Sequence, residues 1–139
     1  MTQGRAFVGG CLCGRLRYEA RDPIEAGYCH CRLCQRSSGA PVLAWAGFPI
    51  AGFSFTKGEP ESYQSSPRGR RDFCASCGTQ IAFRDTATPT RIDVNIASLD
   101  DPASIEPEYH IWVGSCVPWL HIDDDLPRYM DEGPDPPTS

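Results

Sequence analysis

The grouping of its cysteines constrains the fold of this chain more than any other feature. Seven of the eight lie in three short clusters, which read Cys11-Leu12-Cys13, Cys29-His30-Cys31-Arg32-Leu33-Cys34 and Cys74-Ala75-Ser76-Cys77. Thiolates at such spacings are typical zinc ligands. Two pairs and one triplet divide into a site with four thiolates and a site with three. This division predicts one closed structural ion and a second ion with an open position.

A disulfide framework is the competing explanation of these cysteines. It is typical of small secreted domains, yet residues 1–10 hold one Arg, no long apolar run and no processing site. A thioredoxin-like motif requires a Cys-x-x-Cys between a strand and a helix, and the sequence does not indicate that setting. We therefore expect thiolates that bind metal in a reducing cytoplasm. The lone Cys116 is more typical of a small buried apolar group than of a ligand.

The two outer pairs predict the closed site. Sixty residues lie between Cys13 and Cys74, so an ion shared by the pairs would close a long loop and fix two ends of a sheet. Gly14 and Gly78 follow the pairs directly, and glycine permits the positive φ that a tight thiolate turn often requires. We assign the structural zinc to Cys11, Cys13, Cys74 and Cys77.

The central triplet predicts the open site. Cys29 and Cys31 point the same way in an extended segment, and a turn through residues 32–33 brings Cys34 back toward them. The same alternation turns His30 away from the ion. Two alternatives stay open, because His30 or Cys116 could supply a fourth ligand and make this zinc structural as well.

The chemistry of the triplet follows from its charge. Three thiolates and one Zn²⁺ sum to a net negative charge, so the ion is a weaker activator of water than a zinc held by neutral histidines. It favours a soft ligand, and a thiol that coordinates it loses its proton. Cys29, Cys31 and Cys34 are therefore typical of thiol addition to a small electrophile, or of the reverse cleavage of a carbon–sulfur bond. The alternative function is a zinc-stabilised binding module without catalysis.

Length and composition fit one loop-rich domain. The 139 residues suffice for a core, and 13 Gly with 13 Pro predict many turns. No stretch approaches the ~18 apolar residues of a membrane span. The formal net charge of −5 opposes a nucleic-acid partner. Arg68, Arg70 and Arg71 form a local basic cluster that could meet a small anionic ligand or lie in a solvated turn.

Short apolar segments predict a mostly β fold. The expected strands span residues 15–20, 41–48, 52–56, 61–65, 79–84, 91–96 and 109–113. Helix is expected only over 32–38, with a further turn at 102–105. We place a single domain over residues 1–130. Residues 131–139 are rich in Asp, Gly, Pro, Thr and Ser and predict a flexible tail.

Three ordered motifs carry a resemblance to a known family. They are Gly9-Gly10-Cys11-Leu12-Cys13-Gly14, then Tyr28-Cys29-His30-Cys31-Arg32-Leu33-Cys34-Gln35-Arg36 leading to Ser38-Gly39-Ala40-Pro41, and Phe73-Cys74-Ala75-Ser76-Cys77-Gly78-Thr79. A later stretch reads Pro107-Glu108-Tyr109-His110-Ile111-Trp112-Val113, with Pro118-Trp119 and Leu126-Pro127 beyond it. Over residues 7–129 the chain resembles the glutathione-dependent formaldehyde-activating enzyme family, also called the centromere protein V/GFA domain.

The resemblance implies a fold, an activity and two ions. The fold is the β-tent, a small zinc-stabilised arrangement of short antiparallel strands with little helix. The activity is that of a carbon–sulfur lyase, which condenses formaldehyde with glutathione to S-hydroxymethylglutathione. The partners are thus a small-molecule thiol and an aldehyde. The motifs imply a structural zinc on Cys11, Cys13, Cys74 and Cys77 and a catalytic zinc on Cys29, Cys31 and Cys34.

Several other side chains have weaker functional interpretations. Arg36 and Ser38 follow the triplet, so they could hydrogen-bond its sulfurs or hold a carboxylate of the thiol cosubstrate. His110 and His121 have no evident carboxylate partner and are expected as ordinary sheet residues. The aromatic residues that could line a pocket but are expected in the core are Trp45, Phe48, Trp112 and Trp119.

Overall fold

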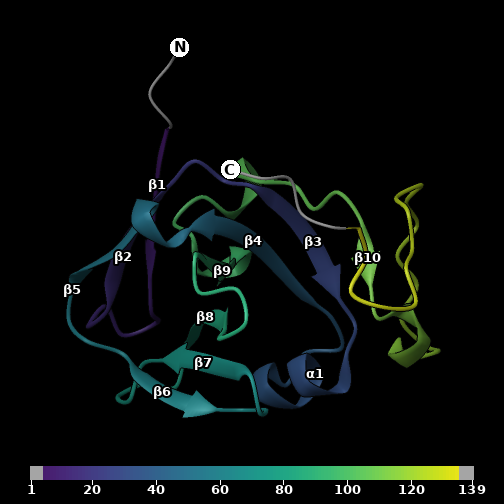
Figure 1. Cartoon of the computed structure of the whole chain (residues 1–139), viewed down its shortest axis with the longest axis horizontal. Coiled ribbons are helices and arrows are strands. Elements are labelled where there is room, and N and C mark those ends of the chain that lie inside the picture. The colour runs from purple at the N-terminus through teal and green to yellow at the C-terminus, as the bar shows by residue number, and fades with distance from the viewer. Residues whose placement is uncertain (1–4, 135–139) are drawn as a thin grey trace.

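A computed structural model describes residues 5–134 as two β-sheets with one short α-helix (Figure 1). The smaller sheet has the strand order β1 (Ala6–Gly10), β2 (Arg17–Arg21) and β5 (Phe53–Lys57). The larger sheet has the order β10 (His110–Ile111), β3 (Glu25–Cys29), β4 (Leu43–Pro49), β9 (Arg91–Asn95), β8 (Gln80–Asp85), β7 (Gly69–Phe73) and β6 (Glu61–Gln64). The predicted mostly β fold is confirmed.

Neighbouring strands pair antiparallel, with one exception. β10 lies parallel to β3, with His110 opposite Tyr28 and Ile111 opposite Cys29. The only α-helix in the described residues is α1 (Arg32–Ser38), at the predicted position. Four single 3₁₀ turns complete the described elements, namely η1 (Ile50–Gly52), η2 (Ile96–Ser98), η3 (Pro102–Ser104) and η4 (Val113–Ser115). No helix in this part of the chain has the length and apolar character needed to cross a membrane.

Three strands were not predicted from the sequence. β1, β3 and β7 carry glycine or charged residues where apolar alternation is expected, so their patterns are weak. In β3, Gly27 provides room for the Trp45 ring, which a β-carbon at position 27 would approach to 2.9 Å. These strands are therefore specified by what packs against them rather than by their own alternation.

The core lies between the two sheets. Side chains along a strand alternate between its faces, and β4 and β9 turn Ala46, Phe48, Ile92 and Val94 toward the small sheet. Tyr18 of β2 meets them there, with its ring stacked 5.4 Å from that of Phe53. Phe48 is thus in the core as expected, whereas the same expectation is wrong for two tryptophans: Trp112 is 40 % exposed and Trp119 is 69 % exposed.

The opposite face of the large sheet carries polar and aromatic side chains. A row of paired residues crosses the sheet from β3 to β7 in the order Glu25, Gly47, Asp93, Phe83 and Arg71. The strand alternation that buries apolar residues on one face turns this row to the other face. Every member of the row that has a side chain lines a cavity.

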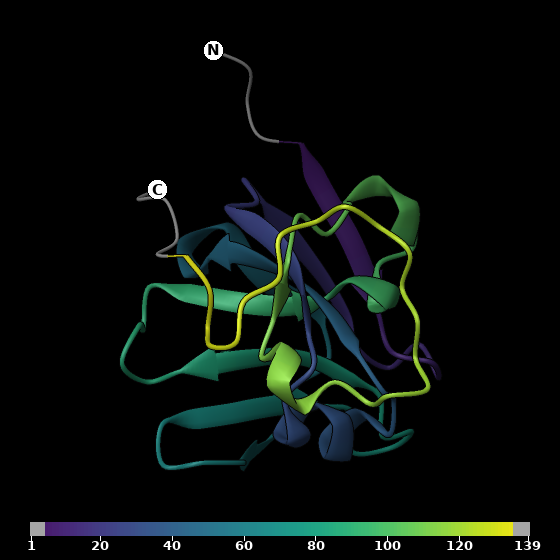
Figure 2. The ribbon, with the colours of Figure 1, turned by 90° about the vertical axis from the view of Figure 1, so that its right-hand side faces the viewer.

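The segment after β10 returns along that strand. His110 donates its backbone N–H to the Pro127 carbonyl, and Tyr129 donates to the carbonyl of His110. Trp112 likewise donates its backbone N–H to the Asp131 carbonyl. Figure 2 shows this segment, coloured light green to yellow, running in front of the strands in that view. Part of the predicted tail, residues 131–134, is therefore described beside β10, and residues 135–139 lie outside the described range.

Candidate metal centres and the adjoining cavity

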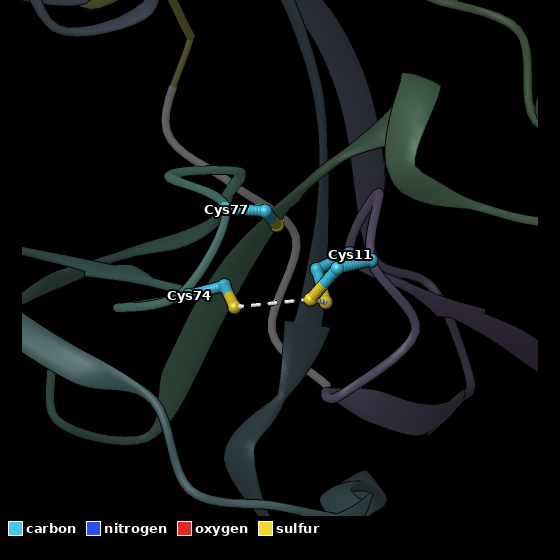
Figure 3. A group of neighbouring side chains, drawn as sticks. Cys11, Cys74 and Cys77 are labelled. Carbon is cyan, nitrogen blue, oxygen red and sulfur yellow. Dashed lines mark hydrogen bonds between the residues drawn. The ribbon is translucent and has the colours of Figure 1, made fainter.

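Two turns from different sheets bring the outer cysteine pairs together. Cys11 and Cys13 lie in the turn between β1 and β2, and Cys74 and Cys77 lie in the turn between β7 and β8. Figure 3 shows Cys74 and Cys77 facing Cys11 across the group. The four Sγ atoms lie within 4.8 Å of one another, as the assignment of one shared ion requires.

Glycine and a threonine hydroxyl shape the two turns. Gly14 and Gly78 both have a φ of 81°, which confirms the positive φ predicted at these positions. The Thr79 hydroxyl lies 3.3 Å from Cys77 Sγ and accepts a hydrogen bond from the Leu12 backbone N–H. The contact with Thr79 lowers the pKa of Cys77 to about 5. The Thr79 side chain thus contacts both turns and favours the ionised form of the Cys77 thiol.

The sulfur separations in this group fit zinc. Cys13 Sγ lies 3.6 Å from Cys11 Sγ and 3.8 Å from Cys74 Sγ. A tetrahedral zinc with bonds of about 2.3 Å places its sulfurs about 3.8 Å apart. A disulfide would hold two sulfurs about 2 Å apart, and every cysteine of the described chain is free. The four residues therefore fit a closed zinc site.

The triplet is assembled from the end of a strand and the start of a helix. Cys29 is the last residue of β3, Cys31 is the N-cap of α1, and Cys34 lies in its first turn. Cys31 and Cys34 therefore have the strand-to-helix setting that the sequence did not indicate. The Cys31 sulfur accepts a hydrogen bond from the Cys34 backbone N–H at 3.3 Å. The three Sγ atoms lie within 4.8 Å of one another. The Cys31 sulfur that caps α1 is therefore also one of the three grouped sulfurs.

No fourth His, Cys, Asp or Glu side chain joins the triplet among residues 5–134. Neither imidazole nitrogen of His30 lies with the three sulfurs, in agreement with its predicted orientation. Cys116 belongs to neither group, and the expectation that it is buried is wrong, because its side chain is exposed at the end of η4. A main-chain turn that follows β10 keeps this residue at the surface.

His30 instead begins a buried hydrogen-bonded series. Its Nε2 lies 2.8 Å from His110 Nδ1, and His110 Nε2 lies 2.9 Å from an Asp124 carboxylate oxygen. Because a carboxylate only accepts, His110 Nε2 donates to Asp124, and in a neutral imidazole the other nitrogen, Nδ1, then accepts from His30. Arg128 also donates to Asp124. Burial opposes ionisation of Asp124, but these two donors lower its pKa to about 2. The expectation that His110 lacks a carboxylate partner is therefore wrong.

The three sulfurs of the triplet do not ionise equally on their own. Hydrogen bonds among them lower the pKa of Cys31 and raise that of Cys29. Three adjacent thiolates repel one another, so a cation is needed to hold all three in the ionised form. Arg71, buried on β7, supplies one charge: its Nη1 and Nη2 lie 3.6 and 3.7 Å from Cys34 Sγ. This donor set fits a zinc ion with one position left open.

A cavity of about 670 Å³ adjoins the triplet. All three sulfur-bearing residues line it, together with the aromatic side chains of Trp45, Phe83, Tyr109 and Trp112. Trp45 and Tyr109 also pack in one buried cluster with Cys29. None of the four outer cysteines lines this cavity. The two groups of cysteines therefore differ in access as well as in number.

A second polar group lies on the cavity wall. Arg91 donates to Glu25 at 2.7 Å and to Asp93 at 2.6 Å, with its guanidinium 5.7 Å from the Trp45 ring centroid. The Tyr109 hydroxyl donates to the other oxygen of Glu25. Burial raises the pKa of Asp93 even though Arg91 lies beside it. Arg91 thus forms ion pairs with two carboxylates at once.

The residues predicted to contact a cosubstrate lie elsewhere. Ser38 is exposed, and its hydroxyl donates to the Cys34 carbonyl at 2.6 Å rather than to a sulfur. Arg36 is exposed in the last turn of α1, and neither residue lines the cavity. The donor to the Cys34 sulfur is Arg71, which the sequence indicated only as part of a basic cluster. Contact of Arg36 or Ser38 with a cosubstrate stays a prediction.

Comparisons with known proteins agree on family and fold. The profile of a family described as glutathione-dependent formaldehyde-activating enzyme matches residues 6–115, a range that contains all seven clustered cysteines. A comparison with curated proteins gave no match. A crystal structure of a Rhodobacter sphaeroides protein from structural genomics is similar at a TM-score of 0.59 and 22 % identity, covering 87 % of this chain and 98 % of that one. At this identity the likeness concerns the fold alone.

Proposed function

The chain belongs to the glutathione-dependent formaldehyde-activating enzyme family, and from this membership we propose that it is a zinc-dependent carbon–sulfur lyase. In this proposal it adds a thiol, with glutathione the first candidate, to formaldehyde or another small aldehyde, and it also catalyses the reverse cleavage. The reducing cytoplasm, where free thiols persist, is the proposed location.

One observation carries the proposal, namely the unequal access of the two cysteine groups. The triplet lines a cavity, whereas the outer four cysteines do not. We assign the structural zinc to Cys11, Cys13, Cys74 and Cys77, and the catalytic zinc to Cys29, Cys31 and Cys34. When bound to the triplet, zinc would supply an open position at which a thiol is held and deprotonated.

The residues around the triplet would position the substrates and shield them from water. The triplet sulfurs would fix the position of the reacting thiol, and Trp45 and Tyr109 pack against Cys29 and add apolar surface to the same cavity. This surface excludes water, which strengthens the electrostatic interactions inside the cavity. A one-carbon aldehyde fills only a small part of about 670 Å³. The remaining volume favours a larger cosubstrate such as a tripeptide thiol.

Metal content and exchange kinetics on the same samples test the proposal. Wild-type protein is expected to hold two zinc ions and to accelerate the exchange of formaldehyde with glutathione, followed by NMR. Cys31→Ser should hold about one zinc and lose the acceleration. Cys116→Ser is the matched control, because its exposed sulfur belongs to neither group, and it should retain both properties. Wild-type protein that exchanges no faster than the spontaneous reaction would favour the zinc-stabilised binding module instead.

A further inference from the structure

Arg71 is a buried cation with a fixed orientation beside the triplet. Its side chain comes from β7 and is 5 % exposed. The Nε atom donates to the Ser65 hydroxyl at 3.1 Å, and the guanidinium carbon lies 4.9 Å from the centroid of the Phe83 ring. A hydrogen bond at one end and an aromatic face along one side leave the guanidinium little freedom to turn.

The two terminal nitrogens of Arg71 point toward the sulfur of Cys34. Both contact Cys34 Sγ, at 3.6 and 3.7 Å, and the residue lines the cavity. Each terminal nitrogen carries two hydrogens, so one hydrogen on each can face the sulfur while the other is available to a ligand. A molecule held at the triplet therefore meets N–H donors that are already in place.

No carboxylate of the described residues competes for Arg71. The other two arginines of the cavity are paired, Arg68 with Asp85 at 2.9 Å and Arg91 with Glu25 and Asp93. Asp72, the neighbouring acid on β7, lies on the opposite face of the sheet from Arg71 and pairs there with Arg84. A buried guanidinium without an acidic partner is costly to maintain. Its position is explained if its charge is directed at the sulfurs and at negative charge that forms beside them.

We propose that Arg71 binds the carbonyl oxygen of the aldehyde and stabilises the oxyanion that forms when the thiol adds to it. This inference rests on the proposed function. In the addition step, a sulfur lone pair forms the carbon–sulfur bond and the carbonyl π pair moves to oxygen. Arg71 hydrogen-bonds that oxygen without giving up a proton. The oxyanion then takes one proton from solvent water, which balances the proton released by the thiol.

Two reactions of the same bound thiol distinguish stabilisation of the oxyanion by Arg71 from a role in which its positive charge only neutralises the cysteine sulfurs. Addition to formaldehyde creates an oxyanion, whereas methylation by methyl iodide forms a carbon–sulfur bond, releases iodide and creates no oxyanion. Arg71→Lys keeps a positive charge near Cys34 but loses the planar pair of donors. We expect this variant to retain two zinc ions and glutathione binding measured by calorimetry. Formaldehyde addition should slow roughly 100-fold, while formation of S-methylglutathione keeps its wild-type rate.

Control variants keep the test decisive. Arg70→Lys changes the adjacent arginine, which contacts Ser62 on the other face of β7, and both reactions should keep their wild-type rates. Phe83→Leu removes the aromatic face and retains Arg71; it should slow formaldehyde addition alone, which gives a second reading if Arg71→Lys does not fold. An Arg71→Lys protein with both rates intact, or with both reduced equally, overturns the role of Arg71 while the proposed function stands. Wild-type protein without any acceleration overturns both.

Discussion

The guanidinium of Arg91 lies over Gly47, in the space that a β-carbon at position 47 would occupy. Gly47 sits between Glu25 and Asp93 in the row that crosses the large sheet, so the missing side chain is what lets Arg91 reach both carboxylates. The arginine cannot move aside without giving up one of these ion pairs.

Gly47→Ala is therefore expected to destabilise the protein by about 1–3 kcal/mol, because the displaced guanidinium leaves a buried carboxylate without its partner. Urea unfolding measures the loss. The same substitution in an Arg91→Met background should cost less, since the clash is gone. An equal cost in the two backgrounds would show that Arg91 is not the cause.

Removing one ligand from each cysteine group should have different consequences. Cys77→Ser is expected to unfold the chain, because structural zinc contributes folding free energy comparable to the whole stability of a domain. Cys31→Ser should lose about one zinc and remain folded, because the triplet joins β3 only to the adjacent α1. Circular dichroism with metal analysis checks both variants. Equal unfolding of the two would assign a structural role to the triplet zinc.

The Asp124 carboxylate should matter more than its acidic neighbours. Asp124→Ala leaves the buried Nε2 of His110 without an acceptor, which is expected to cost about 1–3 kcal/mol. Asp123→Ala and Asp125→Ala are matched controls, because both side chains are exposed in the same segment, and each should change stability by less than about 0.5 kcal/mol. Chemical unfolding of the three variants gives the comparison. Similar losses of unfolding free energy in all three variants would show that the contact between Asp124 and His110 does not stabilise the fold.

Alkaline pH should weaken the fold through Tyr18. Burial raises the pKa of Tyr18 to about 12, although the hydrogen bond with Ser98 opposes this shift. Between pH 10 and 12 the unfolded chain has released a proton that the folded chain still holds, so the free energy of unfolding falls as pH rises. Tyr18→Phe should remove about 2 kcal/mol of this decline.

The control for this measurement is Tyr63→Phe, because Tyr63 is exposed on β6. Thermal unfolding across pH 9 to 12 compares both variants with wild type. Tyr63→Phe should follow the wild-type decline. If Tyr18→Phe shows the same decline as wild type, then the pKa of the Tyr18 hydroxyl does not differ between the folded and the unfolded protein.

Local spacing explains what the sequence predicted well. The spacing inside each cysteine cluster, the positive φ at Gly14 and Gly78, and the helix over residues 32–38 all depend on residues within a few positions of one another. Spacing rules act over that range, so these features were visible without a fold.

Long-range contacts explain what the sequence could not indicate. Arg71 reaches Cys34 from a different element, and Asp124 reaches His110 through a segment without a regular pattern. The strands β3 and β7 depend on the side chains that cover them, such as Trp45 over Gly27. A motif names the ligands of a site, but the residues around those ligands come from the three-dimensional arrangement.

The backbone bonds between β10 and the segment near residues 127–131 affect how far the chain can be shortened. A protein trimmed at residue 115, where the family profile stops, would lose the backbone partners of His110 and Trp112 and the acceptor for the His110 ring. It would also lose Glu132, Gly133 and Pro134 from the lining of the cavity. Truncation at the profile boundary would therefore leave an incomplete edge on the large sheet and an incomplete enclosure beside the triplet.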